Sequence, residues 1–256
     1  MSLTGDLTYF LLILVRMSSC VFFNQIFGRG NLPVMFKTSL SVFLAITVYN
    51  VLPPGNDIII NSVLQYAIII LKELFIGFLI GYIVSMFFSI VVIGGKAMDL
   101  QIGMSMAQLY DPNSQVSMGI SGSFLNAFTI LLFFSVGGHL SLIQIFITSC
   151  KLISIGKFTI PQNLFLNMVE MMTQILTLAA KLALPIIAVE IISEAGIGIL
   201  MKAIPQIQVF SVNIQLKMIV GFLLLIILVP TFSSFIHNML TVMFETIEKS
   251  LSLLIT

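Results

Sequence analysis

The chain has 256 residues, of which 59% are hydrophobic and 8% are charged. Soluble domains average about 45–50% apolar and about 25% charged residues, so these values exclude an ordinary soluble domain and predict an integral membrane protein. The formal net charge is +1, with no basic run, which argues against nucleic acid as a partner.

Six apolar stretches follow one another along the chain. The absence of an alternating pattern of about ten residues argues against a membrane barrel, so we expect an all-α membrane protein with six helical segments as the simplest count. Each stretch is at least long enough to cross a bilayer as a helix: Leu7–Phe27, Val34–Leu52, Ile58–Ile93, Ile120–Ile153, Leu164–Leu200 and Val209–Phe244.

The last four stretches are longer than a membrane requires. A helix over the whole of Ile58–Ile93 would be about 54 Å long, against about 30 Å of hydrocarbon. Either these stretches are broken or hairpinned, for example at Lys72–Glu73, or they pack against other subunits outside the lipid. We therefore expect long kinked helices and helical hairpins, and the second alternative predicts an obligate complex.

The segment from Gly94 to Gly122 interrupts this apolar pattern with charged residues, methionines and glycines. Lipid does not tolerate irregular backbone, so we expect the segment to be irregular and either buried in protein or lining a pore. Met104, Met106 and Met118 are ordinary gap-filling residues in one interpretation. In the other, their flexible side chains form a deformable seal around a pore.

Charged residues within the apolar stretches are candidates for a functional role, because even the mildest scale assigns about 2.5–3.5 kcal/mol to one at a helix centre. Glu190 and Glu194 share a helix face and repel each other, and Lys181 lies on a different face. A partner from another segment or subunit is needed. Two interpretations remain open: an ion- or proton-coupled transport site, or static bridges between packed helices. The candidates are Arg16, Lys72, Glu73, Lys181, Glu190, Glu194 and Lys217.

Two small patterns bear on packing. Gly77 and Gly81 form a G-x-x-x-G motif that allows another helix to approach closely. Cys20 and Cys150 lie in apolar stretches, and we expect them to be buried, unpaired thiols.

Only one short sequence match points to an enzymatic role. Gly119–Gly122 matches the G-x-S-G around the serine of rhomboid-type intramembrane proteases, with Ser121 as nucleophile and His139 or His237 as base. The remaining signatures of that family are missing, and His139, after Gly137 and Gly138, is better explained as a capping or interfacial residue. There is no H-E-x-x-H, P-loop or C-x-x-C pattern, so we expect no metal, no other cofactor and no enzymatic activity.

Three sequence runs, taken together, resemble the FliR family of flagellar export-gate proteins, whose relatives serve virulence-type type III secretion. They are QIGMSMAQLYDPNSQ at Gln101–Gln115, GGHL at Gly137–Leu140 and IPQIQVF at Ile204–Phe210. Arg16, the FGRGNLP run ending at Pro33, Lys37 and the run Lys72–Gly81 match as well. The sequence departs from the family pattern at Gln25, where the family commonly has proline, and at Asn213–Gln215, where it commonly has Gly-x-Pro.

The resemblance implies a non-enzymatic core subunit of the export gate. It further implies a FliP-like part over residues 1–163, containing a plug loop at about 94–123, fused to a FliQ-like helical hairpin over 164–256. The implied partners are FliP-like, FliQ-like and FlhB-like subunits, membrane lipid, and unfolded flagellar proteins as cargo. The implied location is the cytoplasmic (inner) membrane, as a multi-pass protein within the flagellar basal body.

The resemblance and the charge pattern together give three sets of candidate residues. The plug or gate set is Gln101, Gly103, Met104, Ser105, Met106, Asp111, Pro112 and Met118. The set of polar contacts between helices or subunits is Arg16, Lys72, Glu73, Lys181, Glu190 and Glu194. The packing and turn set is Gly77, Gly81, Gly137, Gly138, His139, Pro205 and Gln206. The alternative function is an ion- or proton-coupled small-solute transporter.

Overall fold

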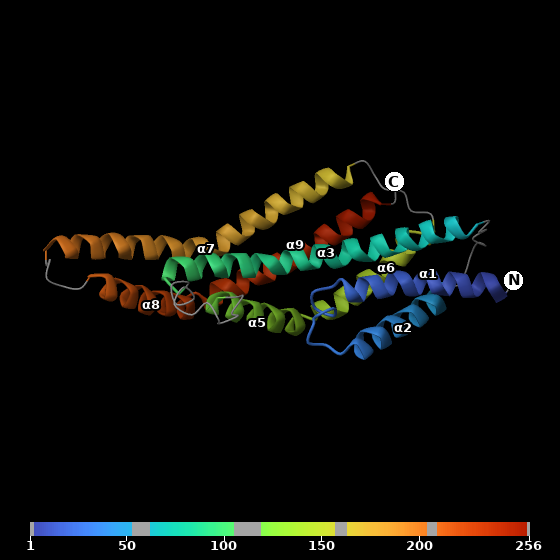
Figure 1. Ribbon diagram of the computed structural model, residues 1–256, viewed down its shortest axis with the longest axis horizontal. Helices are drawn as coiled ribbons and strands as arrows, with labels where there is room; N and C mark the ends of the chain where they lie inside the picture. The colour runs from blue at the N-terminus through green and yellow to red at the C-terminus, as the bar shows by residue number, and fades with distance from the viewer. Residues whose placement is uncertain (1–2, 53–61, 105–118, 157–162, 204–208, 255–256) are drawn as a thin grey trace. The chain divides into compact units, whose positions relative to one another are not determined.

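The computed structural model describes residues 3–52, 62–104, 119–156, 163–203 and 209–254, and within these ranges the regular structure is entirely helical. Figure 1 shows the helices, coloured along the chain. Their bounds are α1 Leu3–Phe22, α2 Val34–Val51, α3 Val63–Ile102, α5 Ile120–Ser135, α6 Gly138–Leu152, α7 Leu164–Ala203, α8 Val209–Ile227 and α9 Val229–Leu253. The prediction of an all-α membrane protein with long helices is confirmed.

The described chain separates into two compact units. The first contains residues 1–86, 134–170 and 240–256, and the second contains 87–133 and 171–239. Each unit draws on both sides of residue 163. This division is a different property from the boundary expected near residue 163, which stays a prediction.

In the first unit, α1 and α2 lie side by side and are joined by a loop over residues 23–33 (Figure 1). Pro33 opens α2 with a φ of −55°, which suits a helix start because the proline ring fixes this angle. The Lys37 ammonium is buried and donates a hydrogen bond to the carbonyl of Gly28 at 2.9 Å. This bond ties the first turn of α2 to the middle of the connection from α1.

The same unit packs α1 closely against α3 at the two glycines of the G-x-x-x-G motif. A Cβ at Gly77 would lie 2.6 Å from the Cβ of Ser19 and 2.7 Å from the carbonyl oxygen of Arg16. A Cβ at Gly81 would lie 2.7 Å from the backbone of Phe23. These spacings leave no room for a side chain, so the glycines allow the two helix backbones to meet.

In the second unit, glycines allow three further close approaches. A Cβ at Gly94 would lie 3.1 Å from the carbonyl oxygen of Ala179 on α7, and one at Gly95 would lie 2.6 Å from the backbone nitrogen of Gly122 on α5. A Cβ at Gly221 of α8 would lie 2.7 Å from the side chain of Ile102 on α3. The C-terminal part of α3 is therefore in contact with α5, α7 and α8.

Three helices of the described chain are long and apolar enough to cross a membrane, α2, α3 and α7, and the number rises to five if α5–α6 and α8–α9 each count as one bent span. The most apolar part of α3 is 61% buried within the protein, but that of α7 is only 33% buried. Much of the apolar surface of α7 is therefore available to lipid or to other proteins.

The long apolar stretches differ from one another in how they are built. The stretch Ile58–Ile93 is not broken at Lys72–Glu73, because α3 continues through both residues. By contrast, the stretches that begin at Ile120 and Val209 are each divided into two helices. Gly137, with a φ of +75°, separates α5 from α6, a conformation that glycine adopts without strain. The simplest count of six helical segments was therefore too low for the described chain.

The seventh helix is continuous but contains Pro185. Proline lacks the N–H that would bond to the carbonyl four residues earlier, and its ring clashes with that carbonyl, so it bends a helix. Figure 1 shows α7 changing direction part-way along its length.

Candidate functional site

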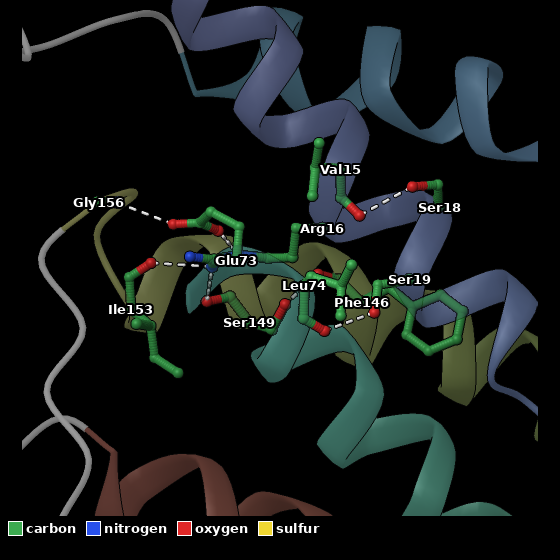
Figure 2. A network of polar contacts seen from close by, with 10 residues as sticks. All are labelled: Val15, Arg16, Ser18, Ser19, Glu73, Leu74, Phe146, Ser149, Ile153 and Gly156. Atoms are coloured by element: carbon green, nitrogen blue, oxygen red, sulfur yellow. Dashed lines mark hydrogen bonds and ion pairs between the residues drawn. The ribbon is translucent and has the colours of Figure 1, made fainter. Parts of the chain in front are cut away.

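The first candidate site is a buried polar network around Arg16 in the first unit (Figure 2). Arg16 and Glu73 are both fully buried, and the Arg16 Nε–H donates to Glu73 Oε2 at 2.5 Å. The Arg16 Nη1 donates to the carbonyls of Ser149 and Ile153, each at 3.0 Å. One guanidinium thus joins α1, α3 and the end of α6.

The partners of Arg16 suit a cation for two reasons. Ser149 and Ile153 lie at the C-terminal end of α6, where unpaired carbonyls carry partial negative charge. The second oxygen of Glu73, Oε1, accepts the backbone N–H of Gly156 at 2.8 Å. Gly156 has a φ of +82°, so the chain turns sharply there without strain.

Nearby contacts reinforce the same junction. The Ser19 hydroxyl donates to the carbonyl of Leu74 at 2.6 Å, as Figure 2 shows. Lys72, next to Glu73 in sequence, is half-buried and makes no ion pair with another described residue. Cys20 and Cys150 are buried, free thiols as predicted. Of these three candidate charges, Arg16 and Glu73 bind each other, and Lys72 is not part of their hydrogen-bond network.

The second candidate site, in the second unit, joins the end of α3 to the start of α5 through Asp99. The Asp99 side chain is buried, and its Oδ1 accepts the N–H of Ser121 at 3.1 Å while its Oδ2 accepts that of Gly122 at 3.5 Å. The first N–H groups of a helix have no partner within the helix, and a carboxylate is favoured there. Asp99 thus caps α5 from another helix.

The residue that would normally cap α5 itself is Gly119. A Cβ at this position would collide with the Asp99 carboxylate. The absence of a side chain at Gly119 therefore makes room for the carboxylate that replaces its capping function.

Asp99 also takes part in the end of its own helix. Its carbonyl accepts the N–H of Met104 at 3.0 Å, and Gly103 has a φ of +90°. A 6→1 hydrogen bond that encloses a left-handed glycine is the Schellman arrangement that terminates helices. The side chain and the backbone of one residue thus fix the two described ends that flank residues 105–118.

This geometry corrects part of the sequence interpretation. Irregular backbone was expected from Gly94 to Gly122, but residues 94–102 belong to α3 and residues 120–122 to α5. Both ends are helical because glycines there pack against neighbouring backbone and Asp99 caps α5. Gln101 lies in the last turn of α3, Gly103 ends that helix and Met104 is largely buried.

Several other candidate residues fall outside the described ranges, namely Ser105, Met106, Asp111, Pro112, Met118, Pro205 and Gln206.

Two further candidates lie on α7. Glu194 pairs with Lys217 of α8, Oε2 to Nζ, at 3.0 Å. Glu190 is fully buried, and neither of its carboxyl oxygens has a hydrogen-bond partner among the described residues. Lys181 is exposed. The sequence interpretation named Lys217 as an intramembrane charge but did not identify it as the partner of Glu194.

The remaining candidates show no catalytic arrangement. Ser121 is fully buried, and its N–H is bonded to Asp99, so its hydroxyl is not accessible to a substrate. Gly138 begins α6, and His139, in the first turn of that helix, packs its ring against Phe134 at a centroid distance of 5.3 Å. Within the described ranges, no group of three acidic, histidine or cysteine side chains is placed to hold a metal ion.

Sequence reasoning missed the role of Asp99 and the carbonyls that bind Arg16. A signal for Asp99 was present, because an acid at the end of an apolar stretch, followed by glycines, must find donors nearby. No such signal exists for the carbonyls of Ser149 and Ile153, since every residue has one.

Comparison with known proteins assigns the chain to a family. Residues 7–243 match the family described as bacterial export proteins, family 1. The flagellar biosynthetic protein FliR of Bacillus subtilis (strain 168) is 25% identical over 248 residues, which cover 95% of each chain. FliR of Escherichia coli (strain K12) is 25% identical over 239 residues, 93% of this chain and 91% of the relative.

A relative from another kind of system is similar over most of its length. The surface presentation of antigens protein SpaR of Shigella flexneri is 26% identical over 219 residues, 84% of this chain and 82% of SpaR. The family match covers far more than half of the sequence, and the two FliR relatives are covered over 91–95% of their length. The chain therefore belongs to family 1 of the bacterial export proteins, together with the FliR proteins.

Proposed function

We propose that this chain is a core subunit of the flagellar type III protein export gate. It helps to form and close the channel through which unfolded flagellar proteins are exported across the cytoplasmic membrane. The observation that carries the proposal is the family match over residues 7–243, joined to relatives named as flagellar biosynthetic proteins and covered over 91–95% of their length. The chain acts as a structural component of that export apparatus.

The exposed surface of α7 supports an assembly with other subunits. A helix of 40 residues is about 60 Å long, twice the hydrocarbon thickness of about 30 Å. Large apolar side chains such as Phe165, Ile192 and Leu200 are 62–73% exposed along it. Lipid covers at most about half of that length, so protein must cover the rest. FliP-like, FliQ-like and FlhB-like subunits are the proposed partners, with residues 1–163 as the FliP-like part and 164–256 as the FliQ-like hairpin.

The Asp99 junction supports a plug role for the segment between Met104 and Gly119. The two described ends of this segment are fixed to one residue by the hydrogen bonds from Met104 and Ser121. A segment that closes a channel must be anchored at both ends while cargo displaces its middle. Asp99 anchors both ends. We propose that the segment closes the channel of the basal body in the cytoplasmic membrane.

The test shortens the segment but keeps the contacts that hold its two ends. Deletion of residues 105–111 retains Gly103, Met104 and the bonds of Asp99, so the complex should still assemble while the membrane becomes leaky to ions. Replacement of the same seven positions by glycine and serine separates the effect of sequence from that of length. Leak is measured as ion flux in cells and export as flagellin in the medium.

The results distinguish the two parts of the proposal. A deletion variant that assembles and keeps a tight membrane would contradict the plug role. A cell that lacks the chain and still exports flagellin would contradict the export role itself. Composition of the complex extracted in detergent, measured by native mass spectrometry, identifies the partner subunits.

A further inference from the structure

The second unit contains a carboxyl group whose environment does not suit a charge. The side chain of Glu190 is 0% exposed, and both of its oxygens lack a hydrogen-bond partner within the described ranges. An ionised carboxylate held in this way loses its hydration without gaining compensating bonds. Buried acids in that situation remain neutral or acquire a cation.

Two charged side chains act on Glu190. Glu194, one helical turn later on α7, repels a charge there, and Lys217 of α8 attracts it. The Lys217 Nζ binds Glu194 at 3.0 Å, with side-chain exposures of 13% for the lysine and 52% for the acid. A mostly buried ammonium therefore binds the more exposed of two neighbouring acids.

We propose that Glu190 is a proton-binding site and that loss of its proton transfers Lys217 from Glu194 to Glu190. In the proposed neutral state Glu190 needs no cation, and Lys217 pairs with Glu194 as the structure shows. When the Glu190 O–H bond breaks and the proton leaves to water, the pair of carboxylates carries two negative charges. Lys217 stays an ammonium throughout and binds the acid that water cannot reach.

The geometry allows the exchange. Side chains four residues apart on a helix have Cβ atoms about 5–6 Å apart, and the lysine side chain is a flexible stem with four methylene groups. The proposed exchange is therefore a rotation of the Lys217 side chain between two acids that lie one turn apart on α7.

A metal ion does not suit this position. Ca²⁺ and Mg²⁺ require several oxygen ligands, whereas Glu190 is a single carboxyl group with the Lys217 ammonium nearby. The proton is therefore the ligand. The inference concerns this one carboxyl and requires no transport of protons across the membrane.

The first test is infrared spectroscopy of the full-length chain, purified with its copurifying subunits, at pH 7. A protonated carboxyl has a carbonyl stretch that a carboxylate lacks, and we expect this band in the unmodified chain and its loss in Glu190→Gln. Glu170→Gln removes an exposed acid of the same helix and should leave the band intact. A band that is absent at pH 7, or unchanged in Glu190→Gln, would overturn the proposal.

The second test examines the exchange through two variants that leave Glu190 in place. Glu194→Gln frees Lys217 for Glu190, so the band should disappear at a lower pH than in the unmodified chain. Lys217→Met removes the competing cation, so the band should persist to a higher pH. We expect shifts of about one pH unit in opposite directions. Shifts of the same sign, or none, would refute the exchange even where Glu190→Gln fails to fold.

Discussion

Asp99 and Ser121 lie 22 positions apart in the sequence and are joined by a hydrogen bond of 3.1 Å from the backbone N–H to the carboxylate. The bond crosses from the last turns of α3 to the first turn of α5. Because an N-terminal cap that comes from another helix fixes both helices at once, it determines where the chain between them starts and ends.

Removal of this cap should loosen the start of α5. We expect Asp99→Ala to lower the free energy of unfolding by about 0.5–2 kcal/mol, the usual range for a lost helix cap, and to increase hydrogen exchange at residues 119–123. Glu248→Ala removes an exposed acid from α9 and serves as the matched control. Equal exchange in the two variants would show that Asp99 does not hold α5.

The Arg16–Glu73 pair predicts a different pattern of variants. Arg16→Ala or Glu73→Ala alone leaves a buried charge without its partner and should destabilise the chain by about 3–5 kcal/mol. The double change Arg16→Met with Glu73→Met should be less damaging than either single change. Thermal unfolding of the purified chain and its yield with copurifying subunits measure both effects.

Lys72→Ala is the control for this pair, because it removes a neighbouring charge that lies outside the network. It should leave stability nearly unchanged. If all three single variants behaved alike, the buried ion pair would not be the cause of the loss.

The close approach of α1 to α3 predicts the effect of adding one methyl group. Gly77→Ala places a Cβ within 2.7 Å of the α1 backbone and should destabilise the chain by about 1–3 kcal/mol, since overpacking displaces the helices. Gly196→Ala is the control: it lies within α7, where no atom comes within 4 Å of the added Cβ. There, alanine should stabilise the helix by about 0.5–1 kcal/mol.

Opposite signs for the two glycine variants, measured by thermal unfolding, would support the packing. A neutral Gly77→Ala would mean that α1 and α3 do not meet at this point.

The sequence predicted the helical class. It also named Arg16, Glu73 and Gly77 as candidates, because burying charge in an apolar chain is costly and glycine spacing follows helical geometry. It did not predict that α3 would run uninterrupted from Val63 to Ile102, because an apolar stretch looks the same whether lipid or protein covers it. The tertiary contacts at Gly95 and Asp99 decide that question, and they are made with residues distant in the sequence.

The pairing of acids with lysines shows the same limit. Helical phase correctly separated Lys181 from Glu190, since it depends only on local geometry. The choice of Lys217 for Glu194 depends on how α8 returns along α7, and periodicity within one helix contains no information about that return.

The Arg16 network has a consequence for biosynthesis. Its carbonyl partners lie 133 and 137 positions after it in the chain, so a ribosome must complete α6 before the guanidinium has its full set of acceptors. Until then Arg16 can pair with Glu73 of α3, but its guanidinium lacks the two carbonyl acceptors from the end of α6. A polypeptide truncated before Ser149 would retain that defect, and so would be a natural target for the proteases that remove incomplete membrane proteins.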